Sequence, residues 1–316
     1  MVKVYAVYLW FFLILLILTG CRAGPPTGPD TSIGDKLAVN GLISPTDNVQ
    51  RMFVSKWYSC SNLSSQPDCP SPKYLDWSIE GARVTITSRQ RTWAGKEVPI
   101  EWWEVNYRNN YASSYQVTIP DISMGQHFSL QVSHPGYDPV EAETVVPDSV
   151  IFTDLPGDTF RTDLSDLRFS WSEAEHAAGY LPELYFVGET DTGYTSQQMY
   201  INFDPNNFSY LEPEAAAIPR ATYDPQKILA QIHHYRHEDF NRWSNVERYD
   251  RYFLVLQVYS LSPALFQAQT YNSQPDPTSS FTIPMTLEGN VVHGGGTFGS
   301  YWVTLSKRII VPKALL

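Results

Sequence analysis

Short runs in which apolar and polar residues alternate recur along most of this chain. Phe128, Leu130 and Val132 alternate with polar neighbours, and residues 82–87 repeat the pattern. A period of two is typical of a β-strand with one face buried and the other in water. Turn sequences such as His134-Pro135-Gly136-Tyr137 separate these runs. Short strands at a spacing of roughly ten residues predict an antiparallel sandwich, with further strands expected at 37–43, 52–57, 98–107 and 115–119.

A second set of strand-like runs follows residues 146–148, which we interpret as a domain boundary. Residues 167–171 and 180–186 are expected to form a strand pair, with Trp171 directed inward toward the tyrosine-bearing strand. The run 252–259 is almost entirely apolar and predicts a central strand, and 301–305 is expected to close the sheet.

Two short helices interrupt the second set of strands. Asp224 can cap one helix, with Pro225 in its first turn. Ser262-Pro263 begins a shorter helix that extends to about Gln269. The predicted fold is therefore mainly β. It consists of two antiparallel sandwiches of the immunoglobulin, fibronectin or transthyretin type, over residues 35–147 and 148–316, the second with these helical insertions.

The composition agrees with an all-β protein and excludes one class of partner. The chain has 20 Tyr, 15 Phe and 9 Trp, and aromatic residues favour strands. Its formal net charge is −11, whereas nucleic-acid binding requires clustered Lys and Arg. We therefore expect no nucleic-acid partner.

The first 20 residues have the pattern of a cleaved export signal. Lys3 provides a basic start, and the uncharged run Val4–Leu18 has 15 residues. This run is shorter than the roughly 20 residues that a helix needs to cross a bilayer. We therefore expect an export signal and not a membrane-spanning anchor.

The sequence Leu18-Thr19-Gly20-Cys21 resembles the lipobox of bacterial lipoproteins. The resemblance implies cleavage after Gly20 and acylation of Cys21 with fatty chains such as palmitate, which would hold the protein on a membrane. Residues 21–34 are rich in Pro and Gly and predict a flexible tether. Arg22 stands where lipoproteins retained in the inner membrane usually carry Asp, so the outer membrane is favoured, with the leaflet left open.

Cys60 and Cys69 remain once Cys21 is assigned to lipid. Export to an oxidising compartment favours a disulfide between them, and two free thiols are the alternative.

Several polar groups could carry chemistry. His233 and His237 share a helix face at a spacing that zinc uses, although the pair lacks a third ligand and His234 stands where the metalloprotease motif has Glu. His293-Gly294-Gly295-Gly296 resembles an oxyanion-hole sequence, but the chain has no G-x-S-x-G motif, so a structural glycine turn is favoured. The remaining groups are acids that could bind calcium or form a glycosidase pair, namely those at 154–166, Glu173 with Glu175, and Glu101 with Glu104.

Trp93, Trp102 and Trp103 are the candidate contact surface, because exposed aromatic rings favour sugars, apolar ligands or a protein partner. One of the adjacent pair Trp102 and Trp103 should face inward on a strand. The glycine-rich segment near residue 294 is a second candidate surface.

Four segments together resemble the outer-membrane lipoproteins grouped as domain of unknown function 4249. They are Leu37–Ile43, Ala82–Ile86, Thr144–Pro147 and the glycine-rich stretch from Gly289 to Gly299. The resemblance covers nearly the whole chain after the export signal and implies association with TonB-dependent outer-membrane receptors.

We therefore expect a lipid-anchored, non-enzymatic binding or accessory module of the outer membrane, with no cofactor and no resident metal. The alternative is an envelope glycan-processing or metal-dependent hydrolase that uses the His233–His237 helix or a pair of acids.

Overall fold

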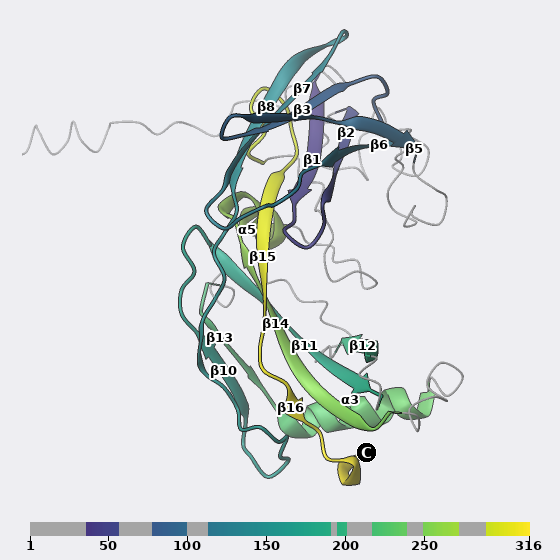
Figure 1. The fold of residues 1–316 in the computed structure, drawn as a ribbon, viewed down its shortest axis with the longest axis vertical. Helices are drawn as coiled ribbons and strands as arrows, with labels where there is room; N and C mark the ends of the chain where they lie inside the picture. Colours follow the sequence, from purple (N-terminus) through teal and green to yellow (C-terminus); the bar gives the residue numbers. More distant parts are fainter. Residues whose placement is uncertain are drawn as a thin grey trace, which may run out of the picture.

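The computed structural model describes residues 36–56, 78–99, 113–190, 195–200, 217–238, 249–271 and 289–316. Its strands form an elongated, curved molecule with two lobes (Figure 1). The first lobe contains β1 to β8, and the second contains β9 to β14, β16 and the helix α3. The helix α5 lies between the lobes, beside β15.

One long sheet runs through both lobes in the order β12-β11-β14-β15-β1-β2-β6-β5. The bounds of these strands are β1 Leu37–Ile43, β2 Val49–Lys56, β5 Lys96–Pro99, β6 Ser113–Thr118, β11 Gly179–Glu189, β12 Thr195–Tyr200, β14 Arg251–Leu261 and β15 Phe298–Leu305. The short strand β16, Ile309–Ile310, also pairs with β14. The long sheet is therefore shared by the two lobes.

Each lobe has a smaller sheet of its own. In the first lobe the order is β4-β3-β7-β8, with bounds β3 Arg83–Ser88, β4 Arg91–Ala94, β7 His127–His134 and β8 Tyr137–Val145. In the second lobe the order is β13-β10-β9, with bounds β9 Phe152–Asp154, β10 Leu167–Trp171 and β13 Arg220–Tyr223. The helices are α3 Pro225–Glu238, α5 Pro263–Tyr271 and the 3₁₀ turn η3 Lys313–Leu315. This architecture confirms the mainly β, sandwich-type prediction.

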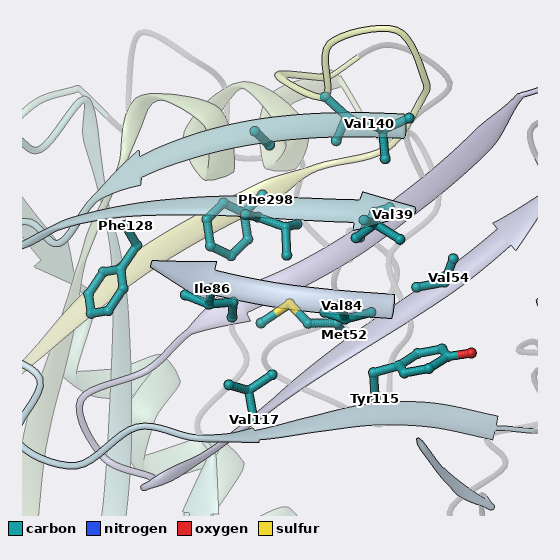
Figure 2. Close-up of a cluster of buried hydrophobic side chains, with 14 of the residues drawn as sticks. Val39, Met52, Val54, Val84, Ile86, Tyr115, Val117, Phe128, Val140 and Phe298 are labelled. Atoms are coloured by element: carbon teal, nitrogen blue, oxygen red, sulfur yellow. The ribbon is translucent and has the colours of Figure 1, made fainter. Parts of the chain in front are cut away.

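The first core lies between the small sheet β4-β3-β7-β8 and the long sheet. Alternate residues of facing strands fill it, as Figure 2 shows for Ile86 and Phe128 on one side and Met52 and Val117 on the other. All four side chains are at most 1% exposed. Burial of every second residue is the reason that the alternating sequence pattern located these strands.

The second core corrects the pairing expected for residues 167–171 and 180–186. Strand β10 pairs with β9 and β13, while β11 pairs with β12 and β14. The two strands therefore belong to opposite sheets, and their aromatic rings meet across the core. The ring centroids of Trp171 and Tyr180 lie 5.7 Å apart at an angle of 74°. Ile228 and Ile232 of α3 are buried in the same core.

The strand β15 lies inside the long sheet, where we had expected it to close a sheet. It pairs antiparallel with β14 and parallel with β1, so that Gly41 aligns with Phe298 and Ile43 with Ser300. Phe298 is fully buried in the core of the first lobe, together with Val291. Residues near the end of the chain thus complete the core of the first lobe, and the boundary near residue 147 does not separate the cores cleanly.

The opposite face of the long sheet carries α5 and a small apolar cluster. Leu265 of α5 packs against Gly299, where a Cβ atom would lie 2.7 Å from the Cβ of Leu265. Tyr259 and Leu261 of β14 join Leu265 in this cluster. Within the described ranges no helix combines the length and apolar character needed to cross a bilayer.

Candidate functional site

Most residues singled out from the sequence for modification or contact lie outside the described residues. These are Cys21, Cys60, Cys69, Trp102 and Trp103, together with Glu101 and Glu104. Trp93 lies on β4 and is half-buried, with its ring centroid 6.4 Å from that of Phe128. It therefore packs against the edge of the first core while keeping part of its ring exposed.

The helix predicted after Asp224 is present as α3. Asp224 caps the helix, since its carboxylate accepts a hydrogen bond of 2.8 Å from the amide of Gln226. His233 Nε2 lies 2.8 Å from the carbonyl oxygen of Leu315, which ties the helix to the end of the chain. His234 is exposed, and the side chain of His237 lies outside the described residues.

The glycine-rich segment has a structural role, as the sequence favoured. The amide of Val39 donates to the carbonyl oxygen of Gly295 at 2.9 Å, and the amide of Gly295 donates to Leu37 at 3.0 Å. Gly296 has a φ of +97°, and a Cβ atom there would lie 2.3 Å from the carbonyl oxygen of Val39. Because any other residue would bring a Cβ atom into β1, only glycine allows the backbone to pack this closely against that strand.

Asp154 ends β9, whereas the other acids of residues 154–166 lie in the loop that follows, where each pairs with a basic side chain. Asp158 binds Lys307 at 2.7 Å, and Asp163 binds Arg161 at 2.5 Å. These acids form ion pairs with different basic side chains and do not come together as the ligands of one metal ion.

A buried acid that the sequence analysis did not single out lies on the face of the long sheet that carries α5. Glu183 is the central residue of the apolar run in β11 and is only 2% exposed. The hydroxyl of Tyr185 donates to its Oε2 at 2.5 Å, and the hydroxyl of Tyr259 on β14 also hydrogen-bonds this carboxyl group. Gln257 in turn donates from Nε2 to the hydroxyl of Tyr259.

The register of the strands explains this convergence. Glu183 stands opposite Gln257, and Leu181 stands opposite Tyr259. Because side chains alternate between the two faces of a strand, Glu183 and Tyr185 point away from the core residue Leu184 and toward the α5 side. Residues two positions apart on β11 and β14 therefore share one face.

The cluster continues toward the first lobe through Tyr301 of β15. The ring centroids of Tyr259 and Tyr301 lie 5.5 Å apart. The hydroxyl of Tyr301 hydrogen-bonds the hydroxyl of Ser44 at 2.7 Å, directly after β1. We call Ser44, Glu183, Tyr185, Gln257, Tyr259 and Tyr301 the tyrosine–glutamate cluster.

Burial dominates the electrostatics of this cluster. It raises the pKa of Glu183 to about 7, and the hydrogen bonds from Tyr185 and Tyr259 act in the opposite direction. The pKa of Tyr259 is also raised, first by burial and then by the nearby Glu183 carboxylate. Near neutral pH the Glu183 carboxyl group can therefore either accept or donate a hydrogen bond.

The sequence carried one signal of this site. Glu183 interrupts the apolar run Tyr180–Phe186 on a predicted strand, and an ionisable residue inside such a run is unusual unless it has partners. Its partner Tyr259 lies far along the chain, however, so the pairing of β11 with β14 was needed to identify the cluster.

Comparison with known proteins places most of the chain in one family. No curated protein matches the chain. The family model "Domain of unknown function (DUF4249)" matches residues 26–307. The strands β1 to β15, the helices α3 and α5 and the tyrosine–glutamate cluster fall within these residues. The chain therefore belongs to the DUF4249 family.

Proposed function

We propose that this protein is a lipid-anchored, non-enzymatic binding module of the outer membrane, and that the tyrosine–glutamate cluster recognises its ligand or partner. The observation that carries the proposal is the hydrogen-bonding of one buried carboxyl group, Glu183, by two tyrosines on adjacent strands.

The chemistry of the cluster suits recognition. Tyr185, Gln257 and Tyr301 are half-buried, so each has part of its surface available for contact while the rest is fixed by packing. Phenol and amide groups bind polar ligands directionally, and tyrosine rings add apolar contact area. A ligand with matching polar groups could hydrogen-bond the exposed parts of these side chains, whereas a ligand without them would exclude water from the same groups and give no hydrogen bond in return, which gives selectivity.

The apolar rim of the cluster extends the contact surface. Leu305 of β15 is 59% exposed and follows Val303 on the same face of the strand. An exposed leucine beside half-buried tyrosines suits a ligand or partner with both apolar and hydrogen-bonding groups.

The candidate catalytic groups of the described part lie apart from this cluster. His233 is on α3, Glu173 and Glu175 are in the turn between β10 and β11, and His293 lies in the loop before β15. Catalysis by these groups would require their convergence, so their separation supports a binding role.

The cellular location of the protein is proposed from the sequence. The lipobox-like segment ending at Cys21 supports acylation, and Arg22 supports the outer membrane. The test is incorporation of labelled palmitate into the wild-type protein and its loss in Cys21→Ser. Equal labelling of the two proteins would remove the lipid anchor from the proposal.

The partner that we propose is a TonB-dependent outer-membrane receptor, as the resemblance to these lipoproteins implies. The experiment is affinity capture with the full-length protein from solubilised outer membranes, comparing wild type, Tyr259→Phe and the exposed control Glu173→Gln. Recovery of such a receptor with wild type and control, but less with Tyr259→Phe, is the expected result. Failure to recover a receptor would refute this partner, and equal recovery with all three proteins would refute the cluster as its binding site.

A further inference from the structure

A second group of ligating side chains converges at the junction of the two lobes. Asp148 lies in the segment that links β8 to β9, while Glu175 and His176 form the turn between β10 and β11. One nitrogen or oxygen atom from each of the three side chains lies within 4.8 Å of the other two. We infer that Asp148, Glu175 and His176 bind a single zinc ion.

The backbone holds the two segments together independently of any ion. The amide of Asp148 donates to the carbonyl oxygen of Glu175 at 2.9 Å. His176 has a φ of +63°, which is a left-handed conformation, and its imidazole lies within 4.8 Å of the carboxylate of Glu175. The fold itself therefore brings the two segments together, and only the side chains of the half-buried Asp148 and the exposed Glu175 and His176 need to move on binding.

The two carboxylates have no Lys or Arg partner among the described residues. No hydrogen bond or ion pair there engages the carboxylates of Asp148 and Glu175 or the imidazole of His176. Two carboxylates held this close repel each other, and a cation between them would remove the repulsion. This differs from the loop 154–166, where Asp158 and Asp163 already have basic partners.

The set of donor atoms indicates zinc. Zinc binds imidazole nitrogen and carboxylate oxygen at about 2.0–2.2 Å, which places tetrahedral ligand atoms about 3.4 Å apart. The present spacing of up to 4.8 Å would have to shorten to that value when the ion binds. Calcium and magnesium favour all-oxygen ligands, and calcium needs six to eight of them, whereas an imidazole nitrogen beside carboxylate oxygens is a donor combination that zinc accepts.

The proposed zinc site lies where the two lobes meet. His127, on β7 of the first lobe, has its ring centroid 6.4 Å from that of His176 in an edge-on arrangement. A zinc ion on His176 would therefore sit where the turn of the second lobe meets the first lobe. This inference replaces the expectation of no resident metal and is independent of the proposed binding function.

The chain offers a matched pair of variants to test the site. His176 and His293 are both exposed and both have a φ of +63°. Glycine tolerates this backbone conformation, so His176→Gly and His293→Gly each remove an imidazole without imposing strain. Zinc binding to the full-length protein is measured by titration calorimetry, with circular dichroism in EDTA as the check that each variant is folded.

We expect wild type and His293→Gly to bind zinc with the same affinity. His176→Gly should weaken this binding about tenfold or more, since even indirect support of a metal ligand is worth that much. His233→Gln, which removes a histidine from the α3 pair, should leave the binding unchanged. The inference is overturned if His176→Gly binds zinc as wild type does, if wild type binds none at micromolar zinc, or if calcium binds more tightly than zinc at this site.

Discussion

The buried carboxyl group of Glu183 makes the stability of this protein depend on pH. Its pKa is about 7 in the folded protein against an ordinary value of 4.5, because burial disfavours the charged form. Between these values the folded state binds more protons than the unfolded state, so stability falls as pH rises. The contribution of the protonated group is fully present below pH 4.5 and is lost as pH rises through about 7. A pKa difference of this size changes the free energy of unfolding by about 3 kcal/mol across this pH range.

The perturbation that isolates this effect is Glu183→Gln. The glutamine keeps the size of the side chain and an acceptor oxygen for Tyr185 and Tyr259, but it cannot ionise. The free energy of unfolding is measured by urea titration at intervals from pH 4 to pH 8 for both proteins. Because all other groups titrate alike, the difference between the two curves should change by about 3 kcal/mol in favour of the variant at the alkaline end.

Two further variants sharpen this test. Tyr185→Phe removes a hydrogen bond that favours the charged form, so the pH dependence should shift to higher pH. Glu173→Gln alters an exposed acid and should run parallel to wild type. Parallel curves for wild type and Glu183→Gln would show that the carboxyl group titrates like an exposed one, and the reasoning from burial would be wrong.

Three other predictions concern the framework around the site. Gly296→Ala should destabilise the protein by about 3 kcal/mol, because φ is +97° and the new Cβ would displace the carbonyl oxygen of Val39. The control is Gly157→Ala, whose new Cβ would meet no atom within 4 Å, and it should leave the thermal midpoint of unfolding nearly unchanged. Phe298→Ala should cost about 3–5 kcal/mol in urea unfolding, since this fully buried ring completes the first core. Asp224→Ala should cost about 1 kcal/mol by the same measurement, because the helix loses its N-terminal cap. A loss well below these values would mean that the contact named is not formed in solution.

The strands were predictable because the alternation of buried and exposed positions along a strand appears in the sequence as an alternation of apolar and polar residues. The structure begins β1 at Leu37 and β10 at Leu167, the residues where the sequence placed them, and β7, His127–His134, contains the alternating residues Phe128, Leu130 and Val132. The start of α3 was equally visible, since Asp224 followed by Pro225 is a local signal that needs no tertiary contact.

The choice of partner strand was not predictable in the same way. An alternating pattern says which face of a strand is buried but not which strand lies beside it. Residues 167–171 and 180–186 have the correct inward faces, yet they lie in opposite sheets. The parallel pairing of β1 with β15 joins the two ends of the folded chain, and no local pattern marks it.

The candidate sites follow the same division. Glu183 could be recognised as unusual within its strand, but its partners Tyr259 and Gln257 depend on the register of β11 against β14. Glu175 was considered as one of a pair of acids with Glu173. Two acids two residues apart can be recognised as a pair from the sequence alone. The proximity of Asp148 to Glu175 cannot, because it depends on a backbone hydrogen bond between segments that are distant in the sequence.

The shared sheet bears on how the tyrosine–glutamate cluster would bind. Ser44 follows β1 in the first lobe, Tyr301 lies on the joining strand β15, and Glu183 lies in the second lobe. Continuous backbone pairing from β1 through β15 to β14 holds these residues in one sheet, so a hinge motion between the lobes would have to break that pairing. A ligand that spans the cluster would therefore meet a surface that is already ordered, and little of its binding free energy would be lost to fixing the lobes. The strand that completes the first core is in this way also the element that would preorganise the site.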